Sequence, residues 1–445
     1  MDMVGLLPDF GNLALTVVAF VAALSVIVAV HEYGHYIVGR WSGIHAEVFS
    51  LGFGPRLASW VDKRGTRWQI AALPFGGYVK FLGDSNAASG KDGAAIRALS
   101  PAEQRHTMHG APLWARAATV AAGPVFNFLM SIAIFAGFFW VKGIATDLPV
   151  VGSLTEVPGV TQGLQPGDRI TAIEGTPTPD LETFFTVADA LPPAPVVRYG
   201  VERAGSATEV SGPYPFPPLV GQVQPLSAAA EAGMEDGDFV QAINGQPVVA
   251  FNQLREIVGG SDGKPVTLTI LRAGAVQEVT ITPKRVDLPK REGGFETRWL
   301  IGLSGGPMFT PETRVPGPVE GLWLGVTQMG DVISTSLSGL GHMIAGKIST
   351  CNVQGPIGIA KTSGAAASMG VSSFLWFIAM LSTAVGMMNL FPIPVLDGGH
   401  LLFHAYEAVT RRPPSDRAMQ VMMAAGLTLL LSLMLFALGN DIVFC

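Results

Sequence analysis

The sequence is poor in cysteine and in charge. Its 445 residues include two cysteines, Cys351 and Cys445, so at most one disulfide can form and a Cys-x-x-Cys metal site is excluded. Charged residues make up 14% of the chain and its net charge is -6, which leaves no basic surface for phosphate groups and argues against a nucleic-acid partner. The hydrophobic share of 49% is too high for a typical soluble enzyme, so we expect a membrane protein.

Long apolar runs support this expectation. The run from Gly11 to Val30 has no charged residue, and no Lys or Arg precedes Arg40, so the basic start of a secretory signal is missing. Three further apolar runs follow, and all four are long enough to cross a hydrocarbon core of about 30 Å. We expect transmembrane helices at about 11–38, 117–141, 371–390 and 418–438.

The first apolar run leads into the motif His31-Glu32-Tyr33-Gly34-His35. Positions i and i+4 lie on one face of a helix, so His31 and His35 can present two nitrogens to one metal while Glu32 reaches its open side. The same pattern occurs on ordinary solvated helices. At the end of an apolar helix, however, these polar side chains are costly unless they are used, and the motif therefore predicts a zinc hydrolase.

A second unusual stretch follows the third apolar run. Residues 389–400 read NLFPIPVLDGGH, and such irregular backbone is tolerated in a membrane only where it is buried in protein or lines a cavity. We predict Asp397 as the third zinc ligand. His400 and His404 are also four residues apart and form an alternative pair, but they lack a Glu in second position; we expect His400 to support the Asp397 turn and His404 to lie on the surface.

Two features of the N-terminal half, residues 1–142, allow two interpretations each. Gly123, Pro124 and Asn127 lie inside the second apolar run, and they indicate either local packing or a site. Alternating residues on both sides of Arg64-Gly65 predict a β-hairpin within 45–82. Its free edge could pair with an extended peptide, or the hairpin could be purely structural. Residues 86–109 look like a surface connection.

The middle of the chain is internally repeated. Residues 163–175 reappear as 233–245, and Pro-Val-Val-Gly at 149 and Pro-Leu-Val-Gly at 218 open the two copies, so two units of one small domain follow each other at 149–217 and 218–287. The Gly-Asp turn, alternating strand and second turn of each copy resemble PDZ domains, which bind extended peptides or chain ends. A spacer pair that binds nothing is the alternative.

The remaining segments set the topology. Apolar residues at steps of three and four from Leu322 predict an amphipathic helix in the connecting region 288–370, with Asp331 and Lys347 making it a poor spanning helix. The C-terminal membrane half is 371–445. Basic residues concentrate in 40–116 and 405–417, so the positive-inside rule places both chain ends and the repeats outside the cytoplasm.

Together these motifs resemble the site-2 protease family across almost the whole chain. The resemblance implies a polytopic α-helical membrane protein with four transmembrane helices, a membrane-associated β-hairpin, and two tandem PDZ-like domains between the second and third helices. It further implies that His31, His35 and Asp397 bind Zn2+ and that Glu32 is the catalytic base.

The resemblance also implies partners and a location. The expected substrate is a single-span membrane protein already trimmed on its outer side, such as an anti-sigma factor of the envelope stress response, with remnant signal peptides as further candidates. The PDZ-like units would act as a size filter or contact the trimmed end. The expected location is the bacterial inner membrane, with membrane lipid around the spans and the PDZ-like units in the periplasm.

The mechanism expected from the residues uses Glu32 as proton carrier between the attacking water and the leaving amine. Asn389 is a candidate donor to the oxyanion or the substrate backbone, and Asn127 is a weaker one. Two rival hypotheses are a related intramembrane protease that degrades a peptide signal and a catalytically idle adaptor that holds partners with its PDZ-like units. The intact set of His31, Glu32, His35 and Asp397 argues against the adaptor.

Overall fold

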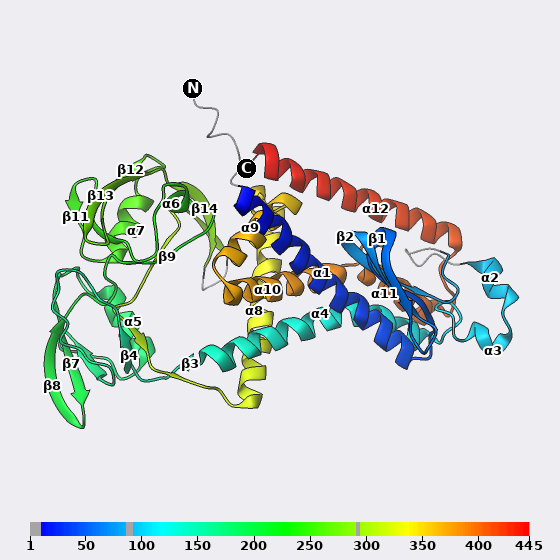
Figure 1. Cartoon of the computed structure of the whole chain (residues 1–445), viewed down its shortest axis with the longest axis horizontal. Helices are drawn as coiled ribbons and strands as arrows, with labels where there is room; N and C mark the ends of the chain where they lie inside the picture. The colour runs from blue at the N-terminus through cyan, green and yellow to red at the C-terminus, as the bar shows by residue number, and fades with distance from the viewer. Residues whose placement is uncertain (1–9, 86–91, 291–293, 445) are drawn as a thin grey trace. The chain divides into compact units, whose positions relative to one another are not determined.

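The computed structural model describes residues 10–85, 92–290 and 294–444. The chain divides into two compact units: unit 1 comprises 1–137, 319–340 and 350–445, and unit 2 comprises 138–318 and 341–349. Figure 1 labels their helices and strands. Residues 86–91 of the expected surface connection, and Cys445, lie outside the described residues.

Within the described residues, four helices are long and apolar enough to cross a membrane, in agreement with the four predicted spans. Their apolar side chains are largely exposed on the protein itself, as for Val18 at 65% and Leu435 at 64%, and this is the pattern expected of helices that face hydrocarbon. The four helices are α1 (Phe10–Trp41), α4 (Leu113–Lys142), α10 (Val371–Asn389) and α12 (Asp416–Gly439).

Small residues let the helices of unit 1 approach closely. A Cβ on Gly34 of α1 would stand 2.5 Å from the Ala122 carbonyl oxygen of α4, and one on Gly325 of α8 would stand 2.7 Å from that of Ile132. Ala23 and Ile27 of α1 pack with Ile378 of α10. Helix association in membranes depends on such close packing, and it holds α1, α4 and α10 around the polar residues described below.

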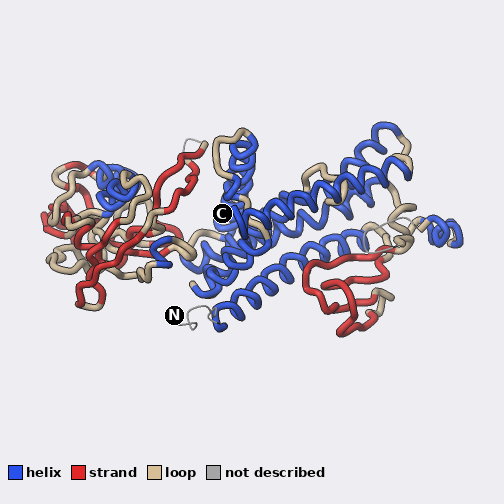
Figure 2. Tube along the Cα trace, turned by 90° about the horizontal axis from the view of Figure 1, so that it is seen from above, coloured by secondary structure: helices blue, strands red, loops and turns tan. Residues whose placement is uncertain are grey.

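The predicted hairpin is present in unit 1. Strands β1 (Ala46–Val61) and β2 (Arg67–Phe81) pair antiparallel and lie beside α1 (Figures 1 and 2). Asp62 closes the turn, because its Oδ1 accepts the backbone N–H groups of Arg64 and Thr66 at 2.8 and 3.0 Å. Phe49 and Val79 pack against Tyr36 of α1, which fixes β2 next to the helix that carries the histidines.

The other helices of unit 1 are shorter or more polar. Helix α8 has the predicted amphipathic pattern and, as expected from its charges, is not among the helices apolar enough to span. Trp323 on α8 is 68% exposed. The bounds are α2 (Gly93–Ala98), α3 (Pro101–Gln104), α8 (Pro318–Ile344), the 3-10 turn η2 (Thr350–Asn352), α9 (Pro356–Ser368), α11 (Asp397–Thr410) and the π-helical turn η3 (Asn440–Phe444).

In its described residues, unit 2 contains two four-stranded sheets of the same design. Their strand orders are β6-β5-β7-β8 and β11-β10-β12-β13, and each packs one helix against a separate apolar core. The first comprises β5 (Arg169–Ile173), β6 (Thr176–Pro177), β7 (Val197–Arg203), β8 (Ser206–Gly212) and α5 (Leu181–Ala190); the second comprises β10 (Phe239–Ile243), β11 (Gln246–Pro247), β12 (Val266–Arg272), β13 (Ala275–Ile281) and α7 (Phe251–Gly259).

The repeat extends to the ion pairs that stabilise each sheet. Arg203 donates two hydrogen bonds of 2.7 Å to Asp168, and Arg272 donates two of 2.6 Å to Asp238. Both aspartates belong to the repeated Gly-Asp turn and both are buried. The sequence repeat therefore encodes one structural unit twice.

The segment beyond residue 287 contains three short strands that pair with earlier strands of unit 2 in separate two-stranded sheets. Strand β16 pairs with β9, β17 with β4, and β18 with β3, all antiparallel. The chain ranges 149–217 and 218–287 are thus completed by residues 303–314. The bounds are β3 (Ile144–Ala145), β4 (Val151–Leu154), β9 (Val220–Val223), α6 (Ala228–Glu231), the hairpin of β14 (Lys284–Pro289) and β15 (Phe295–Leu300), β16 (Leu303–Gly305), β17 (Phe309–Pro311) and β18 (Thr313–Arg314).

Candidate metal centre

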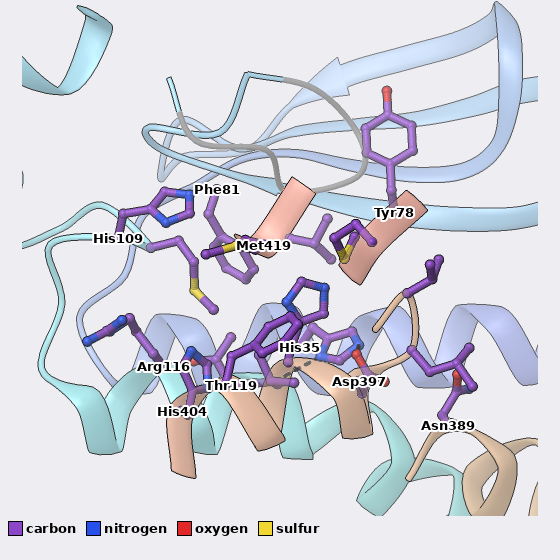
Figure 3. A pocket seen from close by; sticks show the side chains of 18 of the residues that line it. His35, Tyr78, Phe81, His109, Arg116, Thr119, Asn389, Asp397, His404 and Met419 are labelled. Carbon is purple, nitrogen blue, oxygen red and sulfur yellow. Dashed lines mark hydrogen bonds and ion pairs between the residues drawn. The ribbon is translucent and has the colours of Figure 1, made fainter. Parts of the chain in front are cut away.

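Side chains from α1 and α11 meet in unit 1 (Figure 3). His31 and His35 lie one turn apart on α1, and their Nε2 atoms are 3.2 Å from each other. Asp397 is the first residue of α11; its Oδ2 lies 3.2 Å from Nε2 of His31 and its Oδ1 3.5 Å from Nε2 of His35. Within the described residues, these three form the one group of His, Cys, Asp or Glu side chains arranged to hold a metal ion.

The backbone before Asp397 explains the two glycines that follow it. After α10 the chain folds back on itself, so that a Cβ on Gly398 would stand 2.3 Å from the carbonyl oxygens of Leu390 and Phe391, and one on Gly399 would stand 2.3 Å from that of Ile393. Only glycine fits such contacts. The irregular stretch 389–400 thus aims the Asp397 carboxylate at the histidines.

The chemistry of this group fits a zinc ion. Nδ1 of His35 lies 2.8 Å from the carbonyl oxygen of Thr119, which only accepts, so Nδ1 carries the proton and Nε2 is free as a ligand. The lone pair of His35 Nε2 therefore faces Nε2 of His31 and the carboxylate of Asp397. A cation bound between these groups stabilises this arrangement. Oδ2 of Asp397 is buried and accepts no hydrogen bond.

The spacing of the three side chains gives the same result. Tetrahedral zinc with bonds of about 2.0–2.1 Å places its ligand atoms roughly 3.3 Å apart. The contacts between the ligand atoms measure 3.2, 3.2 and 3.5 Å. The two contacts of Asp397 involve different oxygens of its carboxylate. The distances therefore show that the three side chains lie close enough together to hold one metal ion.

Helix α4 packs directly behind the histidines. A Cβ on Gly123 would stand 2.4 Å from Nε2 of His35 and 2.8 Å from Cε1 of His31. Four residues further on, the amide of Asn127 lies 3.2 Å from Nδ1 of His31. Of the two interpretations that the sequence left open for Pro124 and Asn127, local packing or a site, the contact of Asn127 with His31 favours a site for Asn127.

Glu32 lies between the histidines in sequence and faces strand β2. The Val79 backbone N–H donates to its carboxylate, and Gly77 approaches so closely that a Cβ there would stand 3.1 Å from Cγ of Glu32. Both contacts come from β2 of the predicted hairpin. The carboxylate is thus held next to the imidazoles and next to a strand.

The three ligand candidates and Glu32 line one cavity of about 440 Å³. Asn389, the last residue of α10, also lines it, so this candidate donor faces the space that a substrate would enter (Figure 3). Asn127 is fully buried and is not among the lining residues. The two asparagines that the sequence suggested as donors therefore occupy different environments.

The far part of the cavity contains a second set of polar side chains. His400 and His404 line it, so His404 is not the surface residue that we expected; its Nδ1 is buried without a hydrogen-bond partner. Burial, reinforced by the charge of Arg116, lowers the pKa of His404 to about 4. Arg116 on α4 donates two hydrogen bonds, of 3.0 and 2.6 Å, to Glu407 on α11.

Several of these contacts could not be read from the sequence. The carbonyl of Thr119 leaves no mark in the residue type, and Arg116 and Glu407 are far apart along the chain. Gly123 and Gly77 carried a usable signal, because glycine inside an apolar helix or strand marks a close approach of another group.

Comparisons with known proteins show the family to which the chain belongs. A family model described as peptidase family M50 matches residues 19–433. A protein of Agrobacterium fabrum named as a zinc metalloprotease is 35% identical over 427 residues, covering 96% of this chain and 95% of the relative. The regulator of sigma-E protease RseP of Salmonella typhimurium is 33% identical over 455 residues, covering 95% and 97%. The chain therefore belongs to peptidase family M50 and is a zinc metalloprotease of the site-2 type.

Proposed function

We propose that the chain cleaves membrane-spanning substrates at the centre described above, with His31, His35 and Asp397 as zinc ligands and Glu32 as catalytic base. The observation that supports this most strongly is the meeting of all four side chains at one cavity of unit 1. They belong to α1, a helix of spanning length, and to α11, which follows another such helix. The reaction would thus take place at the level of the membrane.

In this mechanism the protein side chains hold and orient the reacting groups and transfer protons between them. Zinc, when bound, supplies Lewis acidity that lowers the pKa of a water molecule and polarises the scissile carbonyl. Glu32 removes the proton of the attacking water and passes it to the leaving amine. Asn389, which lines the same cavity, donates to the developing oxyanion or to the substrate backbone.

The hairpin has a place in the same proposal. A helical substrate hides its carbonyl groups in hydrogen bonds of the i to i-4 type, so it must unwind before attack. Strand β2 passes next to Glu32 at Gly77 and Val79, and a substrate segment paired with the hairpin edge would be held extended. Substrates with helix-breaking residues near the scissile bond should accordingly be cut faster than those stiffened with Leu and Ala.

For the substrate, we propose a single-span membrane protein that another protease has already trimmed on its outer side. The name of the Salmonella relative, regulator of sigma-E protease, supports an anti-sigma factor of the envelope stress response. Remnant signal peptides are a second substrate class, because they too are short single spans. In this proposal the enzyme resides in the bacterial inner membrane, with both chain ends and the repeated units in the periplasm.

The repeated units are proposed to be PDZ-like domains that admit trimmed substrates. In unit 2 a cavity of about 290 Å³ lies between residues of α7, among them Phe251 and Arg255, and residues of β16, among them Leu303 and Ser304. In its sheet β16 pairs with β9 alone, so its second edge can receive an extended chain end. This supports contact with the trimmed end of the substrate, and the same units would obstruct a large untrimmed domain.

The test uses the purified full-length protein in detergent and two versions of a single-span substrate, one trimmed on its outer side and one carrying its folded outer domain. We expect cleavage of the trimmed version, and loss of cleavage and of bound zinc in Asp397→Ala. Equal cleavage of both versions would contradict the filter, whereas full zinc content in Asp397→Ala would contradict the ligand set.

A further inference from the structure

We propose that Asn127 is a positioning residue of the metal centre, whose amide oxygen accepts the Nδ1 proton of His31 and thereby fixes the orientation of this imidazole. Asn127 is fully buried on α4, and its amide lies 3.2 Å from Nδ1 of His31. The inference rests on the proposed ligand set, in which Nε2 of His31 binds the metal.

The direction of this hydrogen bond follows from the other nitrogen of the ring. Nε2 of His31 faces Nε2 of His35 and the carboxylate of Asp397, and a nitrogen that binds a metal carries no proton. The proton is then on Nδ1, which must donate. In the Asn127 amide only Oδ1 can accept it.

The surroundings of Asn127 also support Oδ1 as the atom that accepts the proton of His31. Its Nδ2 is the atom near His31 in this structure, while its Oδ1 is buried without any hydrogen-bond partner. A half-turn of the amide about its last bond exchanges the two atoms, brings Oδ1 to the Nδ1 proton and removes the unsatisfied acceptor. Amide oxygens and nitrogens exchange places in this way without other movement.

The backbone of Asn127 is itself held in place. Its carbonyl oxygen accepts a hydrogen bond of 3.0 Å from the Ser382 hydroxyl of α10. The same helix, α4, also supplies the Thr119 carbonyl, which accepts the Nδ1 proton of His35. Helix α4 thus orients both histidines, one by a backbone carbonyl and the other by a side chain.

This role differs from the donor role that the sequence suggested. A donor to the oxyanion must reach the substrate, but Asn127 is absent from the lining of the cavity while Asn389 is part of it. An asparagine inside a spanning helix is costly unless it is paired. The hydrogen bond to His31 accounts for its position in α4.

The experiment measures zinc affinity of the detergent-purified full chain by competition with a chelator, together with the absorption spectrum of the Co2+-substituted protein. Asn127→Leu keeps the volume but removes the acceptor, and we expect zinc affinity to fall about 10- to 100-fold. Asn127→Asp keeps two acceptors and should retain wild-type affinity. The matched control, Thr383→Ala, removes a buried hydroxyl of α10 that donates to the Ala379 carbonyl of its own helix, and should leave affinity and the Co2+ spectrum unchanged.

The outcomes separate the two proposals. Wild-type zinc affinity in Asn127→Leu, or an equal loss in Asn127→Leu and Asn127→Asp, would overturn the acceptor role of Asn127. Where Asn127→Leu does not fold, Asn127→Asp decides alone, and a tenfold loss of affinity in it would overturn the inference. Zinc affinity that is unchanged in His31→Ala would instead overturn the ligand set on which the inference rests.

Discussion

Gly123 lies so close to His35 that a Cβ atom on Gly123 would stand 2.4 Å from Nε2 of the imidazole. The same Cβ would stand 2.8 Å from Cε1 of His31. The Nδ1 atom of each ring also contacts α4, His35 at the Thr119 carbonyl and His31 at the Asn127 amide. Rotation of either ring would break its contact. Gly34, where a Cβ would stand 2.5 Å from the Ala122 carbonyl oxygen, and Gly123 together allow the second spanning helix to approach the two histidines this closely.

Gly123→Ala should therefore displace the histidines and lower zinc affinity by at least about tenfold, with proteolysis falling in parallel. Zinc content after dialysis against a chelator provides the measurement. Gly137→Ala is the matched control, since it lies in the same helix and a Cβ there meets no atom within 4 Å. Normal zinc retention in Gly123→Ala would show that the close contact does not determine the ligand geometry.

A variant of a second glycine, Gly77, should affect cleavage without affecting zinc binding. A Cβ on Gly77 would stand 2.8 Å from the Ser50 carbonyl oxygen and 3.1 Å from Cγ of Glu32, so Gly77→Ala should push β2 away from α1. We expect cleavage to fall roughly 10- to 100-fold, since small displacements in an active site have such effects, while zinc content stays normal. Loss of zinc together with activity would assign Gly77 to the metal centre instead.

The proposed metal ligands were predictable because a helix fixes the spacing of His31 and His35, and because the broken backbone around Asp397 indicates a buried polar site. The three side chains do meet in the structure. The groups that orient them were not predictable, since the Thr119 carbonyl looks like any other in the sequence. The four spans and the repeat followed from apolar runs and self-similarity, whereas the return of residues 303–314 to strands β9, β4 and β3 depends on long-range pairing without a local signal.

The ion pair of Arg116 and Glu407 connects α4 to the helix that begins with Asp397. Both side chains are mostly buried and share two hydrogen bonds, so removing one partner leaves an uncompensated charge. Glu407→Ala should lower the free energy of unfolding of the helical unit by roughly 3 kcal/mol, as followed by the helical circular dichroism signal in denaturant.

The matched control for this ion pair is Glu174→Ala in unit 2. Glu174 pairs with Arg198, which is 64% exposed, and exposed pairs contribute at most about 1 kcal/mol. A double variant, Arg116→Met with Glu407→Leu, should recover much of the stability because no unpaired charge remains. Equal losses in Glu407→Ala and Glu174→Ala would contradict the structural role of the buried pair.

The stability of the first sheet in unit 2 should depend on acid. The Arg203 guanidinium, by its hydrogen bonds and charge, holds the pKa of Asp168 below its ordinary value of 3.8. Because the folded-state pKa lies below the unfolded one, the stabilisation is complete above about pH 4 and is lost as the pH falls through the folded-state pKa. The difference in unfolding free energy between wild type and Asp168→Asn should therefore be large at pH 6 and shrink as the pH falls below about 4.

Glu278 on β13 is exposed and serves as control for Asp168, and Glu278→Gln should change the unfolding free energy only slightly at pH 6. The measurement is denaturant unfolding of the full chain, followed by near-ultraviolet circular dichroism, at pH values from 2 to 7. If the difference in unfolding free energy between wild type and Asp168→Asn stayed constant over this pH range, the Asp168 carboxylate would not be the source of the acid dependence.

The most direct test of the account is Glu32→Gln, because it removes the proposed base and keeps the three proposed ligands. The full chain is purified in detergent, its zinc content is measured, and cleavage of a trimmed single-span substrate is followed. We expect zinc at the wild-type level and a rate about 10²- to 10⁴-fold lower. Cleavage at the wild-type rate would show that Glu32 is not the base and that this cavity is not where the peptide bond is broken.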